Sequence, residues 1–173
     1  LRYEPLEREA VTGLEIKTVN DNWTGFHGWE FRVGERPVAV GKLGRYCFAG
    51  SRERHEVRIV PVKRGPYDEP ANPSTVIASV LIDAGQAAAD GMVYAALAQP
   101  VRLEPNTRYM IASYETAGGD PFAADVELTL DPAIEWVGGC YTLSAPDQPG
   151  GYWYPVQSIE PGRALNAVSF VMQ

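Results

Sequence analysis

The feature that most constrains the fold of this chain is a series of short segments in which apolar and polar residues alternate. In residues 55–62, Val57 and Ile59 fall on one face of an extended chain, while Glu56 and Arg58 fall on the other. Alternation with a period of two is typical of a β-strand that buries one face. The 17 glycines and 14 prolines are spread between such segments, where they favour turns. The sequence therefore predicts an all-β protein.

Further segments with the same pattern bring the expected number of strands to about nine or ten. Pro61 cannot donate a hydrogen bond to a neighbouring strand, so the strand at 55–62 either ends at Val60 or lies at a sheet edge. The alanine-rich residues 84–98 form one helical turn at most, because glycines interrupt them. The other expected strands are residues 13–19, 28–33, 37–48, 75–83, 92–98, 107–115, 126–130 and 166–173.

Many short strands separated by turns favour a two-sheet arrangement over a parallel α/β fold. We expect a single domain, an antiparallel β-sandwich of jelly-roll-like type over residues 13–173, after an N-terminal extension or linker at 1–12. Residues 63–74 and 143–165 are rich in proline and lack periodicity, so we expect surface loops there. The chain starts at Leu1, and we expect it to be part of a longer protein or processed at its start.

The charge balance narrows the partners. Fifteen Lys and Arg stand against 22 Asp and Glu, a net charge of -7. This sign repels a phosphate backbone and anionic lipid, so we expect no nucleic acid as a partner. No apolar run approaches the roughly 20 residues that span a bilayer, so we expect no membrane partner.

Several motifs follow one another in an order shared with a known type of module: TVNDNWTGFHGWEFRVG, VGKLGRYCFAG, HEVRIV, MVYAALAQPVRLEPNTRYMIASYETAGGD, and a final YPV followed by VSF. Over residues 13–172 the chain resembles a β-sandwich accessory module found, often without assigned function, at the ends of secreted bacterial multidomain proteins, many of which degrade polysaccharides. Cys47 after LGRY and the long insertion at 63–74 depart from the pattern. The resemblance implies a non-catalytic, extracellular module covalently linked to a catalytic domain or a surface protein. It implies no particular sugar.

Aromatic residues are the candidates for ligand binding, because the flat face of an indole or phenol ring can desolvate the apolar C–H patch of a sugar ring. Alternation in residues 28–33 places Trp29 in the core. The long segment before the last strand carries Tyr152, Trp153 and Tyr154 side by side, which form either an exposed binding platform or a cap on an open end of the sandwich. The second choices for ligand binding are Trp23, in a polar turn, and Trp136.

Carboxylates flank a Gly-Gly turn in SYETAGGD, residues 113–120. Asp21, Glu115 and Asp120 could together hold a structural calcium ion, which takes oxygen ligands from loops. In the alternative interpretation, Asp120 caps the turn through its own backbone, and Glu115 accepts hydrogen bonds from Arg45 or from backbone amides. No other cofactor is expected.

Cys47 and Cys140 are too far apart in the sequence for a zinc motif, and they are either two buried thiols or a disulfide. Nor does the sequence hold a nucleophile elbow, an HExxH helix, a P-loop or a dinucleotide-binding turn. His55, at the start of a strand, is expected as a hydrogen-bonded rim residue.

Together these features predict a monomeric, non-catalytic carbohydrate-binding module that targets a secreted bacterial enzyme to a polysaccharide or oligosaccharide. Two alternatives stay open: a structural or protein-interaction module of spacer or adhesin type, and a small jelly-roll glycoside hydrolase or polysaccharide lyase.

Overall fold

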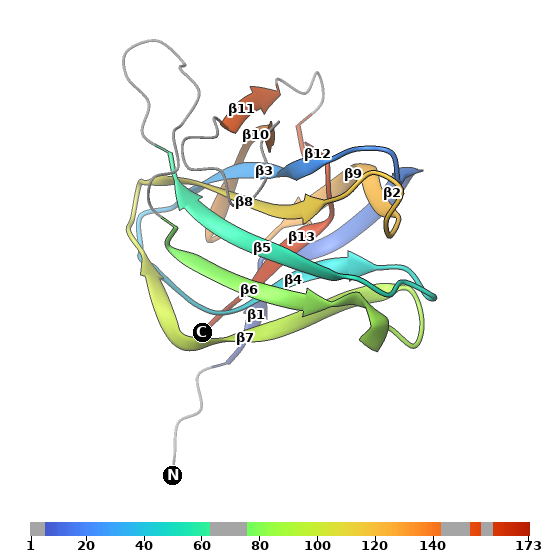
Figure 1. Cartoon of the computed structure of the whole chain (residues 1–173). Coiled ribbons are helices and arrows are strands. Elements are labelled where there is room, and N and C mark those ends of the chain that lie inside the picture. Colours follow the sequence, from blue (N-terminus) through green and yellow to red (C-terminus); the bar gives the residue numbers. More distant parts are fainter. Residues whose placement is uncertain (1–5, 63–75, 143–152, 157–160) are drawn as a thin grey trace.

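The computed structural model describes residues 6–62, 76–142, 153–156 and 161–173. Apart from one short 3₁₀ turn, η1 (Ala84–Gln86), the regular elements described are β-strands (Figure 1). The strands are β1 (Arg8–Glu9), β2 (Val11–Asn20), β3 (Gly25–Val33), β4 (Val38–Cys47), β5 (Arg54–Pro61), β6 (Ala78–Asp83), β7 (Gly91–Leu103), β8 (Arg108–Glu115), β9 (Phe122–Leu130), β10 (Ile134–Thr142), β11 (Trp153–Val156), β12 (Arg163–Ala164) and β13 (Val168–Met172).

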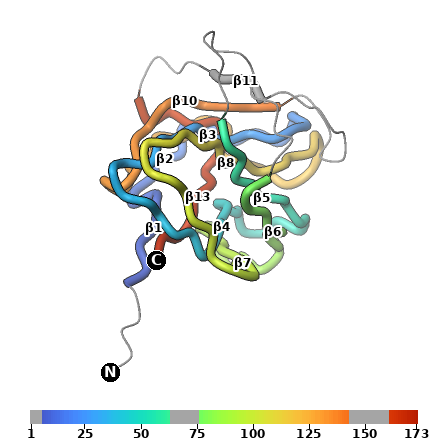
Figure 2. The backbone as a smooth tube through the Cα atoms, turned by 90° about the vertical axis from the view of Figure 1, so that its left-hand side faces the viewer, coloured from blue at the N-terminus to red at the C-terminus, as the bar shows by residue number. Residues whose placement is uncertain are grey.

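These strands form three antiparallel sheets. One sheet has the order β1-β13-β4-β7, the second β11-β10-β3-β8-β5-β6, and the third β12-β9-β2. Strands β1 and β13 run side by side, so the C-terminus lies close to the first described strand (Figures 1 and 2). The expected antiparallel β-sandwich is confirmed.

Aromatic side chains pack the six-stranded sheet against the four-stranded sheet in the larger of two buried clusters. Trp29 and Phe31 of β3 are fully buried, and their rings lie 6.4 and 5.1 Å from the ring of Phe170 in β13, measured between centroids. The indole nitrogen of Trp29 donates to the carbonyl oxygen of Val168 at 2.9 Å, so its polar atom is satisfied. The prediction that Trp29 is a core residue is confirmed.

The described strands differ from the expected set of nine or ten. Thirteen are present in the described residues, and β10 and the short strands β1, β11 and β12 are absent from the expected set, while several other strands begin or end a few residues away from their predicted bounds. Strand β5 continues to Pro61, one residue past Val60, and lies between β6 and β8 rather than at an edge. This is tolerated because Pro61 pairs only with Tyr109 of β8, beyond the last β6 partner. Near the N-terminus, strand pairing starts at Arg8. Residues 8–12 therefore belong to the sheets and not to the expected extension at 1–12.

Other expectations agree with the structure. The single helical turn predicted in residues 84–98 is η1, and both cysteines are buried free thiols, as the first of the two interpretations held. The predicted loop at 63–74 and most of that at 143–165 lie outside the described residues. The described part of the second segment holds the short strands β11 and β12, which pair with β10 and β9, so the prediction of a loop is wrong there. Among the described residues, no helix has the length and apolar composition needed to cross a membrane.

Candidate functional site

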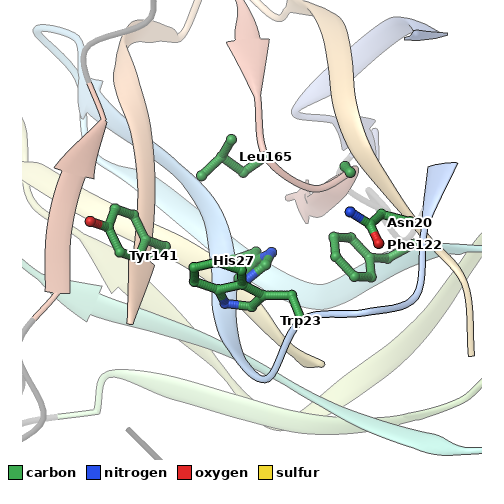
Figure 3. A pocket seen from close by; sticks show the side chains of 7 residues that line it. Asn20, Trp23, His27, Phe122, Tyr141 and Leu165 are labelled. Carbon is green, nitrogen blue, oxygen red and sulfur yellow. The ribbon is translucent and has the colours of Figure 1, made fainter. Parts of the chain in front are cut away.

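A small pocket opens where one end of the six-stranded sheet faces the three-stranded sheet. Its volume is about 250 Å³. Figure 3 shows Tyr141 on one side, Phe122 and Asn20 on the other, Trp23 and His27 between them, and Leu165 above. We call this the aromatic pocket; its lining residues are Asn20, Trp23, His27, Phe122, Ala124, Tyr141 and Leu165.

Strand register brings these residues together from distant parts of the chain. His27 of β3 is directly opposite Tyr141 of β10, and Asn20 of β2 is directly opposite Phe122 of β9. Residues that are directly opposite in an antiparallel pair present their side chains on the same face. The six-stranded sheet therefore contributes one cross-strand pair to the pocket and the three-stranded sheet contributes the other. The connection between β2 and β3 adds Trp23.

Trp23 is the exposed ring of the pocket. It is 39 % exposed, one of the few large apolar side chains in the described chain that face water to this extent. Its ring meets His27 and Tyr141 edge to face, with centroid distances of 5.3 and 6.1 Å. Edge-to-face contacts fix the orientation of an aromatic ring. Trp23 is thus held in place while part of its surface remains accessible.

His27 forms the base of the pocket beside Trp23. Burial lowers the pKa of His27 to about 4, although the negative charge of Glu115 opposes that shift, so the imidazole is neutral at neutral pH. Its Nε2 atom is buried and has no hydrogen-bond partner among the described residues. Such orphaned polar atoms are uncommon in native proteins. The pocket therefore combines aromatic rings with an unsatisfied polar group.

Backbone and side-chain hydrogen bonds hold the connection that carries Trp23, residues 21–24. The Asn20 side-chain oxygen accepts the amide hydrogen of Asn22 at 2.9 Å, which leaves its NH₂ group as a donor at the pocket (Figure 3). Gly25 closes the connection at a φ of 142°, and a β-carbon there would overlap the carbonyl oxygen of Thr142. Only glycine permits this close approach.

A buried group of charged side chains lies between the sheets at the same end of the molecule. Arg45 of β4 donates from Nε and Nη2 to the two carboxylate oxygens of Glu115 in β8, both at 2.9 Å, and Asn166 donates to Glu115 Oε1 at 2.9 Å. The side chains of Arg45 and Glu115 are 0 % and 1 % exposed. Burial raises the pKa of Glu115, but His55 and Arg45 outweigh it and lower the pKa to about 2.

His55 of β5 extends this group to Asp120. His55 Nδ1 lies 3.0 Å from the carbonyl oxygen of Tyr114 and 3.2 Å from Glu115 Oε2, and Nε2 lies 3.0 Å from Asp120 Oδ2. All three partners are acceptors, so both ring nitrogens carry a proton and the ring is an imidazolium. Burial lowers the pKa of His55, yet Glu115, and to a smaller extent Asp120, raise it above the usual 6.5. We call Arg45, His55, Glu115 and Asp120 the charged cluster.

Asp120 is the outermost member of the cluster. Its two carboxylate oxygens accept the amide hydrogens of Arg52 and Glu53 at 2.9 and 2.8 Å, and its own amide donates to Glu53 Oε2 at 3.0 Å. The predicted cap through the backbone of its own turn is thus replaced by bonds to a segment 67 and 68 positions away. The predicted acceptance of Arg45 hydrogen bonds by Glu115 is confirmed.

The geometry bears on metal binding in two ways. Glu53, His55 and Asp120 place one ligand atom each within 4.8 Å of one another, with Glu53 open to solvent, but His55 Nε2 would have to lose its proton before it could bind a cation. Of the three calcium ligands predicted from the sequence, Asp21 lies near the turn that precedes Asp120, since its carbonyl oxygen accepts the Gly118 amide hydrogen at 2.6 Å. Calcium at Glu115 would have to displace the guanidinium of Arg45. The calcium site stays a prediction.

The sequence-predicted aromatic residues are distributed differently. Trp23 lines the pocket, whereas Trp136 is half-buried and stacks on Trp29 at 6.1 Å, where it extends the core. Trp153 and Tyr154 lie in β11, and the backbone of Tyr154 is directly opposite that of Tyr141. Their side chains and the whole of Tyr152 lie outside the described residues.

Sequence reasoning missed Tyr141, Phe122 and His27 as pocket residues. Tyr141 lies at the end of a strand and is directly opposite His27 in the neighbouring strand. This could have identified both as pocket residues, but only if the register of β3 and β10 were known. Comparisons with known proteins add no further residues. No protein-family model matches the chain, and a search of curated proteins finds no match.

Proposed function

We propose that this domain is a non-catalytic carbohydrate-binding module that uses the aromatic pocket, and that it serves as an accessory module of a secreted bacterial polysaccharide-processing enzyme. The observation that carries the proposal is Trp23: a partly exposed indole, fixed edge to face by two neighbours, over a pocket with polar groups beside it. The resemblance of the chain to secreted accessory modules supports the cellular setting.

The chemistry of the pocket fits a sugar better than a purely apolar or a charged ligand. The indole of Trp23 and the phenol of Tyr141 offer apolar surface for the C–H patch of a pyranose ring. The amide NH₂ of Asn20 offers a hydrogen bond to a hydroxyl group. None of the described lining residues carries a full charge at neutral pH, since His27 is neutral there.

The size of the pocket limits the ligand. Drug-sized ligands occupy pockets of roughly 300–1,000 Å³, and about 250 Å³ is slightly smaller. The pocket therefore accepts about one sugar unit, with the rest of a polymer outside it. A single stacked ring contributes only a few kcal/mol against the cost of ordering, so we expect Kd values on the order of 0.1–1 mM for an oligosaccharide. Attachment to an enzyme would make such weak binding useful by raising local concentration.

The test is affinity electrophoresis of the domain through gels that contain soluble glycans, followed by titration calorimetry with oligosaccharides of any glycan that retards it. We expect Trp23→Ala to abolish retardation. The matched control is Leu81→Ala, since Leu81 is 61 % exposed on β6, at the opposite edge of the six-stranded sheet from β11.

A Trp153→Ala arm separates the pocket from the platform predicted at residues 152–154. Loss of binding in Trp153→Ala alone would move the binding site to that segment and overturn the role of Trp23. No retardation on any glycan would favour a spacer or interaction module, and the appearance of reducing ends or unsaturated products would favour an enzyme.

A further inference from the structure

The charged cluster and the Trp23 connection are joined by one turn, residues 116–120. On one side of this turn, Asp120 is bound by His55, by the amides of Arg52 and Glu53, and through its own amide by Glu53 Oε2. Arg45 Nη2 adds a hydrogen bond to the carbonyl oxygen of the next residue, Pro121, at 3.1 Å. The Asp120 end of the turn is therefore held by the buried side chains of Arg45 and His55 and by the segment that contains Arg52 and Glu53.

The other side of the turn contacts the connection that carries Trp23. The Ala117 amide donates to Thr24 Oγ1 at 3.0 Å, and the Gly118 amide donates to the carbonyl oxygen of Asp21 at 2.6 Å. These two bonds fall on either side of Trp23 in the sequence. Gly118 has a φ of 80°, a conformation that glycine adopts without strain and that directs its amide to Asp21.

From these contacts we infer that the turn at 116–120 positions Trp23 for ligand binding, with Thr24 as the positioning residue on the ligand side and Asp120 as its anchor in the charged cluster. The inference rests on the proposed function, because it assigns Thr24 and Asp120 a part in the affinity of the aromatic pocket. Neither residue lines the pocket, and neither is expected to touch the ligand.

The physical reason is the cost of ordering an exposed ring. A flexible connection would have to be fixed when ligand binds, and that cost lowers affinity. Two hydrogen bonds to a turn that is itself anchored on buried ionic groups fix the connection before ligand arrives. The buried part of the structure thus contributes to binding through pre-organisation rather than through contact.

Thr24→Val tests the inference with little change in size. Valine keeps the shape of threonine and removes the acceptor for the Ala117 amide. We expect Thr24→Val to weaken glycan binding about fivefold, the equivalent of one net hydrogen bond. Because Thr24 is exposed, the melting temperature should change by no more than about 2 °C. Thr24→Ser keeps the hydroxyl group and should bind glycan with wild-type affinity.

The matched control is Thr12→Val, which removes an exposed threonine hydroxyl that donates to the Thr129 carbonyl oxygen in another part of the molecule. It should leave affinity unchanged. An affinity of Thr24→Val equal to that of the wild type, or a loss that Thr24→Ser shares, would overturn the inference.

A second measurement needs no glycan and so separates the inference from the proposed function. The ¹⁵N indole resonance of Trp23, assigned by its loss in Trp23→Phe, should broaden or shift in both Thr24→Val and Asp120→Ala, and remain at the wild-type position in Thr24→Ser and Thr12→Val. An unchanged Trp23 resonance in Thr24→Val and Asp120→Ala would overturn the inference even if the domain binds a glycan. A changed resonance without glycan binding would retain the positioning role and refute the carbohydrate proposal.

Discussion

The buried ion pair between Arg45 and Glu115 makes the sharpest prediction about stability. Glu115→Gln keeps the shape of the side chain but removes its charge, which leaves the guanidinium of Arg45 buried without a counter-ion beside it. Breaking a buried pair by removing one partner costs about 3–5 kcal/mol. Glutamine can still accept one of the two hydrogen bonds from Arg45. We therefore expect the low end of the range, about 3 kcal/mol.

For a domain of this size, 1 kcal/mol shifts the melting temperature by roughly 2–4 °C, so Glu115→Gln should lower it by about 6–12 °C. Urea denaturation followed by tryptophan fluorescence gives the free energy of unfolding, and calorimetry gives the melting temperature. The matched control is Glu104→Gln, which breaks the Arg102–Glu104 pair, whose side chains are 63 % and 58 % exposed. Exposed pairs contribute about 0–1 kcal/mol.

The reasoning is refuted if Glu115→Gln costs less than about 1 kcal/mol or no more than Glu104→Gln. A double variant, Arg45→Met with Glu115→Leu, adds a second check. Replacement of both partners leaves no unpaired buried charge, so the double variant should lose less stability than the sum of the two single variants. Strict additivity would show that the two side chains do not act as a pair.

Further predictions concern pH, backbone, core and metal. The pKa of Glu115 is lowered from 4.5 to about 2 in the folded state, so stability should be lost as pH falls from about 4.5 through about 2, and Glu115→Gln should show a smaller loss over that range in urea denaturation. Gly25→Ala should destabilise the domain by more than about 1 kcal/mol, because of the overlap with Thr142, while Gly91→Ala, with nothing within 4 Å of the added carbon, should be nearly neutral in the same assay. Trp29→Ala should cost about 3–5 kcal/mol through the cavity it leaves in the core; a cost below about 1 kcal/mol would show that the ring is not part of the packed interior. If calcium binds at Asp21, Glu115 and Asp120, excess CaCl₂ should raise the melting temperature relative to EDTA, and equal values would remove that site.

Much of the fold could be predicted from the sequence, because a strand with one buried face requires apolar residues at alternate positions. The alternation around Val57 and Ile59, and that around Trp29, depends only on neighbours two positions apart, and the structure buries all three side chains. The glycine-interrupted segment at 84–98 was correctly limited to one helical turn for the same local reason. The strand start was misplaced at residue 13, because residues 8–12 pair with strands far along the chain.

The candidate site was only partly readable. The polar neighbours of Trp23 predict its exposure, and the sequence also predicts Arg45 as a hydrogen-bond partner for Glu115. The position of Trp136 on Trp29 could not be anticipated, since a ring at that point of a strand can face either way. The place of His55 between Glu115 and Asp120 was likewise hidden, because 60 and 65 positions separate it from those carboxylates.

Local pattern and composition were thus sufficient for the class of fold, the core ring of Trp29 and the exposure of Trp23. The aromatic pocket and the charged cluster depend on which strands pair and in what register, as in the alignment of His27 with Tyr141. A slip of one residue would turn each of those side chains to the opposite face of its sheet. Which strands pair is decided by packing of the whole domain, so the alternation in one strand fixes its buried face but not its partner.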